Sequence, residues 1–269
     1  MGNAYEERLG TDRMLPLIFK MSLPAVAAQL VNLLYNIVDR IYIGHIPGIG
    51  TDALAGIGVT SAVIILISSF SAIVGAGGSP LAAIALGQGN RERAGQILGN
   101  GFILLLIFTI LTSATTYLFM EPILLFTGAS ENTIGYATDY LSIYLLGTLF
   151  VELSVGLNTF INTQGRPTIA MYSVLIGAIL NIGLDPLFIF TFGMGVKGAA
   201  LATILSQACS AIWVISFLTS KKASLRLEYR YMKLHKGIIL SILALGVSPF
   251  IMASTESLVG FVLNSSLEK

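Results

Sequence analysis

The amino-acid sequence predicts an all-α membrane protein, with a six-helix transmembrane lobe followed by a seventh transmembrane helix. Three observations lead to this fold class. Of the 269 residues, 55% are hydrophobic and only 11% are charged, whereas soluble domains carry roughly 25% charged residues. The mean hydropathy is +0.83. The apolar residues form seven long runs of about 20 to 33 residues each, and such lengths suit helices that cross a bilayer.

Composition and run length exclude several other classes. A net charge of +1 with only 15 Lys and Arg residues argues against a nucleic-acid partner. Cys209 is the single cysteine, which excludes an intramolecular disulfide framework and a cysteine-rich metal site. The runs are too long for strands and lack the alternation of a membrane barrel. No cleavable signal is expected, because the first 20 residues carry charges of both signs.

The seven runs define the predicted order of elements. They lie near Met14–Ile46, Leu54–Leu86, Ala94–Phe119, Ile134–Ile161, Thr168–Phe192, Gly198–Leu218 and Gly237–Leu263. We therefore expect an amino-terminal cytoplasmic segment at 1–13, the six-helix lobe at 14–219, a basic connection at 220–236 and the seventh helix within 237–269. The first run would reach about 50 Å, beyond a hydrocarbon core of ~30 Å. Pro24 supplies a site at which this helix can bend.

Glycine and proline punctuate the runs. The segments 87–90 (Gly-Gln-Gly-Asn) and 164–167 (Gln-Gly-Arg-Pro) are predicted to be tight turns, since they match no nucleotide-binding fingerprint. Within 75–80, three glycines and Pro80 are predicted to interrupt the second helix. Pro186 and Pro249 fall inside later runs. Transporters use such broken helices near their binding sites.

Basic residues predict the orientation, because Lys and Arg near helix ends are retained on the cytoplasmic side. They occur before the first run, between the second and third, between the fourth and fifth, and in a cluster after the sixth, whereas the alternate connections carry few. The chain is therefore expected to be a multi-pass protein of the plasma (inner) membrane with a cytoplasmic amino terminus. The basic connection at 220–236 is expected to lie along the cytoplasmic surface as a helix.

Ionisable residues inside the apolar runs are the candidates for function. A charge at mid-membrane costs about 2.5–3.5 kcal/mol even on lenient insertion scales. The residues in question are Asp39, Arg40, Glu152, Asp185 and Glu256. Arg40 is interpreted as a residue that snorkels or pairs, and it cannot share a helix face with the adjacent Asp39.

Asp39, Asp185 and Thr203 are predicted to lie in one layer. Counting from the outer ends of their helices places all three roughly 8–11 Å below the outer boundary. Tyr35 and Asn181 lie four residues before the two aspartates and so on the same helix faces. These hard oxygen ligands suit a cation, and two neighbouring carboxylates equally suit a shared proton. The alternative is that the polar groups only join helices.

A weak internal repeat accompanies this layer. Sliding the chain by 225 positions places Pro249 on Pro24 and Asn264 on Asp39. If genuine, the seventh helix begins a second copy of a six-helix unit, parallel to the first.

Four segments together resemble the multidrug and toxic-compound extrusion (MATE) transporters, over essentially the whole chain after the first dozen residues. They are 36–44 (Asn-Ile-Val-Asp-Arg-Ile-Tyr-Ile-Gly), 156–165 (Gly-Leu-Asn-Thr-Phe-Ile-Asn-Thr-Gln-Gly), 181–189 (Asn-Ile-Gly-Leu-Asp-Pro-Leu-Phe-Ile) and 198–203 (Gly-Ala-Ala-Leu-Ala-Thr). The resemblance implies a partial MATE-type twelve-helix fold.

The resemblance also implies a function. It implies an antiporter that exchanges external sodium ions or protons for an internal amphipathic or cationic compound, with no enzyme activity and no cofactor besides the coupling ion. The matching positions are Asp39, Asn181, Asp185 and Thr203 for the cation site, Tyr35 and Asn158 beside it, Glu256 for a possible second-lobe site and Pro24 for helix bending.

Length sets this chain apart from the family pattern. It supplies about half of a typical member, so we expect a truncated gene or fragment, unless a second chain or the missing second lobe completes it. Alone, it is expected to bind an ion without transport. The alternatives are a lipid-linked oligosaccharide flippase of the same superfamily and a non-transporting membrane fragment. A membrane-embedded transferase is disfavoured, since no aspartate-rich or histidine-bearing motif lies at a helix end.

Overall fold

Long helices make up almost all of the computed structural model, which describes residues 14–267. They are α2 (Met14–Gly44), α3 (Gly50–Gly87), α4 (Arg91–Leu118), α6 (Ile134–Thr163), α7 (Pro167–Pro186), α8 (Val196–Thr219) and α9 (Lys236–Leu267). The short elements are α5 (Met120–Phe126), the π-helix η1 (Leu187–Thr191) and the 3-10 helix η2 (Tyr229–Tyr231). The predicted segment 1–13 and the last two residues lie outside the described residues.

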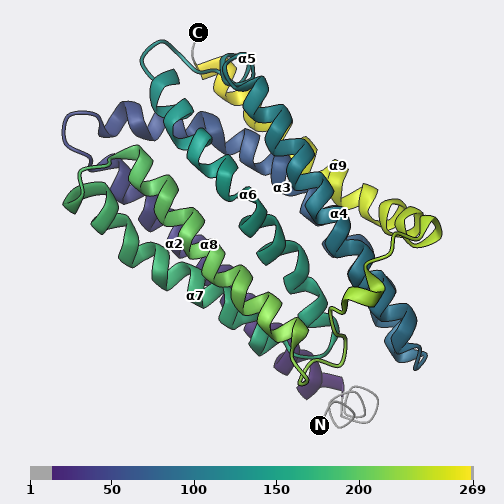
Figure 1. The fold of residues 1–269 in the computed structure, drawn as a ribbon. Coiled ribbons are helices and arrows are strands. Elements are labelled where there is room, and N and C mark those ends of the chain that lie inside the picture. Colours follow the sequence, from purple (N-terminus) through teal and green to yellow (C-terminus); the bar gives the residue numbers. More distant parts are fainter. Residues whose placement is uncertain (1–13, 268–269) are drawn as a thin grey trace.

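The predicted fold class is confirmed. Seven helices are long and apolar enough to cross a membrane, and each coincides with one of the seven predicted runs within a few residues at either end. In Figure 1, α6 runs between a group formed by α2, α7 and α8 and a second group formed by α3, α4 and α9. Polar side chains of α6 can therefore meet both groups.

The two predicted tight turns are confirmed. Gly89 and Gly165 adopt φ values of 74° and 72°, which L residues with a side chain rarely adopt. Asn90 then caps α4 through a hydrogen bond from the Arg93 backbone N–H to its Oδ1 of 2.9 Å, and α7 begins at Pro167, where a missing N–H costs nothing. Each turn reverses the chain at the same end of the bundle.

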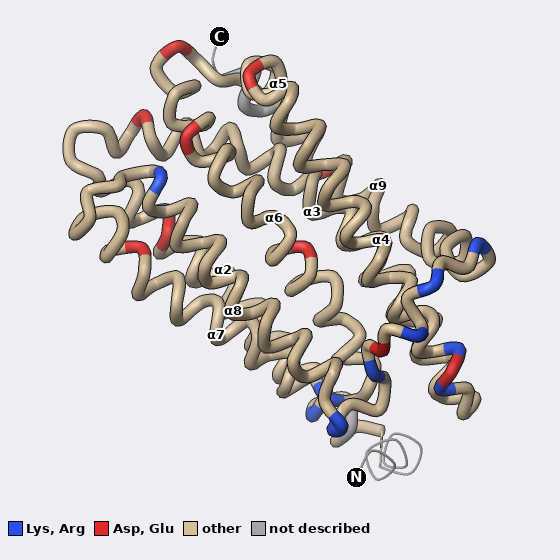
Figure 2. Tube along the Cα trace, in the orientation of Figure 1, with Lys and Arg blue, Asp and Glu red and all other residues tan. Residues whose placement is uncertain are grey.

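Lys and Arg gather at that end, as Figure 2 shows. We call it the basic end; it comprises the connections 88–90, 164–166 and 220–235. The other end, formed by the connections 45–49, 119–133 and 192–195, carries Glu121 and Glu131, with Asp52 and Asp139 nearby, and is called the acidic end. This separation is the pattern that sets topology in membranes.

The predicted interruption of the second helix is wrong, because α3 continues without a break through 75–80. The glycines there serve close packing against α9 instead. A Cβ atom on Gly77 would overlap the Ile242 carbonyl oxygen, and one on Gly246 would overlap the Ile73 carbonyl oxygen. Glycine thus lets two helix backbones touch, as small residues commonly do in membrane bundles.

The expected surface helix at 220–236 is also wrong. The connection is irregular apart from η2, with turns and bends at 220–225, and Ala223, Leu225 and Leu227 are buried while Ser224 is half-buried and Arg226 is exposed. This period of two residues suits an extended chain and not a helix. The connection is therefore part of the packed core at the basic end.

Two buried amides hold this connection in place. The Asn100 side chain of α4 donates to the Lys233 carbonyl at 3.0 Å and accepts from the His235 N–H at 2.8 Å. The Gln164 side chain, at the end of α6, accepts from the Leu225 N–H at 3.0 Å. The bond to Gln164 satisfies the backbone N–H of the buried Leu225, and the bonds of Asn100 tie the end of the connection to α4.

We expect Asn100→Ala to lower the free energy of unfolding by about 1–3 kcal/mol, since it removes both hydrogen bonds between the buried Asn100 side chain and the connection. Thermal unfolding of the purified chain measures the loss, and limited trypsin digestion should show faster cleavage within 220–235. Thr112→Ala is the control, because its hydroxyl bonds only within α4, to the Phe108 and Thr109 carbonyls. Equal effects of the two variants would contradict the role assigned to Asn100.

Candidate functional site

Three helices bring the predicted polar layer together. Asp185 and Asn181 lie four residues apart on α7, and both are buried, with exposed fractions of 0% and 2%. The Asn181 Nδ2 atom donates to Asp185 Oδ1 at 3.2 Å and to Thr203 Oγ1 of α8 at 3.5 Å. The amide of Asn181 therefore orients one carboxylate and one hydroxyl together.

Asp39 of α2 completes the group. Its carboxyl group lies within hydrogen-bonding reach of the Asp185 carboxyl. Arg40, the next residue, turns elsewhere and its Nη2 donates to the Ser61 hydroxyl of α3 at 3.5 Å. The prediction that Asp39 and Arg40 do not share a face agrees with this. We call Asp39, Asn181, Asp185 and Thr203 the carboxylate cluster.

Three buried oxygens of the carboxylate cluster have no hydrogen-bond partner among the described residues. They are Asp39 Oδ1, Asn181 Oδ1 and Asp185 Oδ2. Buried acceptors without a donor are costly, and here they come from three side chains that already meet. Carboxylate and amide oxygens are the ligands that a hard monovalent cation prefers, and either carboxylate can instead take a proton. The residues present therefore fit a sodium ion or a proton.

A local break in α-helical geometry positions this cluster. Pro186 has no N–H, and after it the chain widens into η1, where the Phe192 N–H donates to the Leu187 carbonyl, five residues back, at 2.9 Å. The chain then returns into α8, and a Cβ atom on Gly198 would come within 2.8 Å of the Phe188 carbonyl oxygen. This close approach brings the first turns of α8 against the end of α7, which places Thr203 beside Asn181.

The sequence interpretation missed Tyr140 of α6. This buried side chain interacts with Thr203 and Asp39, and its ring stacks on that of Tyr144, with centroids 6.2 Å apart. A signal was present in the sequence, because Tyr140 and Tyr144 are four residues apart in an apolar run and so share a helix face.

Tyr35 and Asn158 line one cavity of about 440 Å³, at separate ends of it. Tyr35 lies one helical turn from Asp39 and interacts with both aspartates. The Asn158 Nδ2 atom donates to the Ala170 carbonyl near the start of α7. Ala170 precedes Asp185 by 15 residues, or about 22 Å of helix. Asn158 therefore lies outside the carboxylate cluster and cannot ligate the same ion as Asp185.

The lining of the cavity combines apolar side chains with polar ones. The polar ones include Ser68, Tyr144, Asn162 and Gln207, and none of the described residues that line it is Lys, Arg, Asp or Glu. Among the described residues no group of three His, Cys, Asp or Glu side chains could hold a metal ion. The carboxylates of Asp39 and Asp185 therefore lie beside this cavity, next to Tyr35, and do not line it.

Glu256 and Pro24 lie apart from the carboxylate cluster. Glu256 is exposed on α9, which packs along α3 through a hydrogen bond of 2.7 Å from the Ser257 hydroxyl to the Ala62 carbonyl. Pro24 lies inside α2, about four turns before Asp39, and α2 continues through it. Their predicted roles remain predictions.

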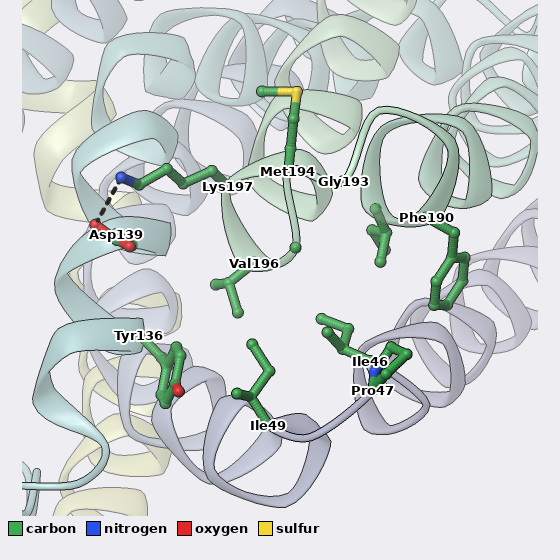
Figure 3. Close-up of a pocket in the computed structure, with 12 residues that line it drawn as sticks. Ile46, Pro47, Ile49, Tyr136, Asp139, Phe190, Gly193, Met194, Val196 and Lys197 are labelled. Atoms are coloured by element: carbon green, nitrogen blue, oxygen red, sulfur yellow. Dashed lines mark ion pairs between the residues drawn. The ribbon is translucent and has the colours of Figure 1, made fainter.

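A second pocket of about 530 Å³ opens at the acidic end (Figure 3). Apolar side chains such as Ile46, Ile49 and Met194 line it, and an ion pair of 3.3 Å between Lys197 and Asp139 lies at its edge. Ile189 belongs to the lining and follows Asp185 by one helical turn. The carboxylate cluster thus lies about one turn beneath this pocket.

The fold and the cluster together define a multi-pass helical membrane protein with acidic groups buried in its interior. A family model described as MatE matches residues 24–187, more than half of the chain. The chain belongs to the MATE family, as its four sequence segments had indicated.

Known relatives support the assignment. The chain is 28% identical over 243 residues to the multidrug export protein MepA of Staphylococcus haemolyticus, covering 90% of this chain and 53% of that protein. It therefore spans about half the length of the curated relatives it matches. Inward-facing and outward-facing structures of a multidrug resistance MATE family transporter of the MOP superfamily match with TM-scores of 0.81 and 0.84. Their identities are 27% and 28%, and each match covers 93% of this chain and 56% or 55% of the other.

We expect Asp39→Asn to raise the unfolding free energy by about 1 kcal/mol in sodium-free buffer at neutral pH. The change removes one of two neighbouring carboxylates, and the new amide can donate to Asp185 Oδ2; such gains are common at functional sites. Thermal unfolding of the purified chain measures it. Asp52→Asn, at an exposed carboxylate in the first turn of α3, should leave stability unchanged or slightly lower. A lower melting temperature for Asp39→Asn would show that its carboxylate stabilises the cation-free lobe.

Proposed function

We propose that this chain forms the cation-coupling lobe of a multidrug efflux antiporter. In this proposal, external sodium ions or protons enter the carboxylate cluster, and an amphipathic or cationic compound leaves the cell in exchange. The observation that carries it is the convergence of three buried, unpartnered oxygens from Asp39, Asn181 and Asp185 beside the Thr203 hydroxyl. The relatives named as multidrug export proteins support the same function.

Charge balance gives the exchange its logic. Two ionised carboxylates close together in a poorly solvated site repel each other, so the cluster needs a cation or a proton. A sodium ion would be held by oxygens of Asp39, Asp185, Asn181 and Thr203, whereas a proton would be shared between the two carboxyl groups. An arriving cation therefore displaces a proton or removes the net negative charge that attracts a cationic compound.

The cavity supports an amphipathic or cationic substrate. Its lining combines hydroxyl and amide groups with apolar side chains, and it holds no basic residue. A flippase for a polyanionic lipid-linked oligosaccharide would need positive charge there. Among the described spans, Arg40 is the basic side chain nearest to the cluster, and it turns toward Ser61. The flippase alternative therefore has less support than multidrug efflux.

Orientation and location are part of the proposal. The basic end would face the cytoplasm, which places the amino terminus inside and the pocket of Figure 3 outside the plasma membrane. External cations would then reach the carboxylate cluster from the side of this pocket. Surrounding lipid would cover the exposed apolar side chains.

Alternating access would require a second lobe, supplied by further chain or by a second copy. The similarity of this lobe to both an inward-facing and an outward-facing structure supports its movement as one body. Two lobes rocking about a fixed site are the usual arrangement in such transporters. We propose no catalytic activity, no resident cofactor and no nucleic-acid partner.

We expect sodium to stabilise the native chain against thermal unfolding, by about 2.7 kcal/mol at a concentration 100 times its dissociation constant. Asp185→Asn should fold but lose this stabilisation, because an amide keeps hydrogen bonds without carrying the charge. Glu131→Gln, which changes an exposed carboxylate in the connection 119–133, is the matched control and should keep it. Choline chloride at equal ionic strength corrects for screening.

Titration at two pH values separates the two coupling ions. If protons compete for the same cluster, sodium should stabilise the chain less at the lower pH. For a site that takes protons alone, sodium has no effect, but the dependence of stability on pH should differ between the native chain and Asp185→Asn. Identical behaviour of these two proteins in both titrations would contradict the proposed function.

A further inference from the structure

Helix α6 carries four buried polar side chains at successive steps of four residues. They are Tyr140, Tyr144, Thr148 and Glu152, with exposed fractions of 5%, 5%, 0% and 1%. Side chains four residues apart are neighbours on a helix surface, so the four form one line along α6, which we call the α6 polar ladder. It extends over 12 residues, or about 18 Å.

The outer end of the ladder meets the carboxylate cluster. Tyr140 interacts with Thr203 and with Asp39. The rings of Tyr140 and Tyr144 are nearly parallel, with an interplanar angle of 16°, and the Thr148 hydroxyl donates to the Tyr144 carbonyl at 3.1 Å. The four side chains therefore lie along one face of α6, from the carboxylate cluster toward the basic end.

The inner end of the ladder is Glu152, and neither of its carboxyl oxygens has a hydrogen-bond partner among the described residues. The Ser68 hydroxyl of α3 lies beside both Tyr144 and Glu152. Ser71 lies near as well, but its hydroxyl donates to the Ser68 carbonyl at 2.8 Å. The Ser68 hydroxyl can donate to a Glu152 carboxylate, and a protonated Glu152 carboxyl can instead donate to Ser68 Oγ.

The surroundings of Glu152 hold no compensating charge. Tyr144 of α6 itself is the titratable group that interacts with it. The described helices packed against α6 carry their charged residues near the ends of the bundle or in the carboxylate cluster, namely Asp52 of α3, Arg91, Glu92 and Arg93 of α4, Glu121 of α5, Asp185 of α7 and Lys197 of α8. A buried carboxylate without a counterion is strongly disfavoured.

We propose that Glu152 holds a proton inside the lobe and forms a second proton site, joined to the carboxylate cluster by the α6 polar ladder. Its ligand is a proton and not a metal cation, because two serine hydroxyls and one phenol give too few free oxygens around it. Protons can reach it through Ser68, which lines the polar cavity. The connection rests on the proposed function of the cluster, whereas the protonation of Glu152 does not.

Infrared spectroscopy of the purified chain tests the protonation directly. The chain is made with glutamate labelled by ¹³C at its side-chain carboxyl, so that bands of glutamic acid shift while those of aspartic acid stay. At neutral pH we expect one protonated glutamic-acid carbonyl band in the native chain. Glu152→Gln should abolish this band, and Glu131→Gln, at an exposed carboxylate in the connection 119–133, should retain it. A native chain without a label-sensitive acid band, or a band that survives in Glu152→Gln, would overturn the proposal.

The ladder is tested by removing one phenol hydroxyl at a time. Tyr144→Phe should shift the Glu152 acid band. It removes the phenol hydroxyl that contacts Ser68, and the Ser68 hydroxyl also lies beside Glu152. Tyr172→Phe is the matched control, since Tyr172 packs on Trp213 between α7 and α8 and lies off the ladder. An unshifted band in Tyr144→Phe would overturn the connection.

The sodium titration of melting temperature is read separately. If sodium and pH fail to distinguish Asp185→Asn from the native chain, the proposed function of the cluster fails. The spectra still decide whether Glu152 is protonated, because the labelled band requires no occupant in the cluster.

Discussion

The hydrocarbon core of a bilayer offers no water to the backbone, so each N–H and C=O group must be hydrogen-bonded within the protein. A membrane-spanning helix does this within its own segment. The described spans follow this pattern closely, including α3, which continues through three glycines and a proline. Departure from α-helical geometry within these spans is concentrated in η1, directly after Asp185 and Pro186. Such π-type turns recur at functional sites. Here the turn brings α8 onto the end of α7. The irregular backbone therefore also positions the side chains of the carboxylate cluster.

Because the helices satisfy their own backbones, side chains have to supply the chemistry of the lobe. Glycine determines how closely helices approach, as Gly77 and Gly246 show between α3 and α9. Polar side chains determine which faces turn inward. Central α6 contacts both groups of helices, so its polar side chains can reach the carboxylate cluster on one side and α3 on the other.

The seven spans, the two tight turns and the contact of Asp39 with Asp185 could be predicted, because each depends on local periodicity, turn chemistry or depth counted along a helix. The role of the glycines at 75–80 could not be predicted, because glycine favours both a break in a helix and the close approach of two helices. Asn158 matched a family motif, but only the bond to Ala170 shows its distance from Asp185. The connection at 220–236 carries alternating apolar residues, which indicate a buried non-helical segment. Its many basic residues favoured a surface helix instead, so this pattern was missed.

The carboxylate cluster also joins helices that otherwise share little polar contact. None of the described side chains of α2 before Ile43 is buried, so α2 is attached to the lobe mainly along α7. Asp39 belongs to α2, whereas Asn181 and Asp185 belong to α7. In the proposed function, two ionised carboxylates facing each other without a cation would push these helices apart. With a cation or a shared proton between them, the same groups would hold α2 against α7. Occupancy of the cluster would therefore act on the packing of a whole helix, which is how an ion can drive a change of conformation.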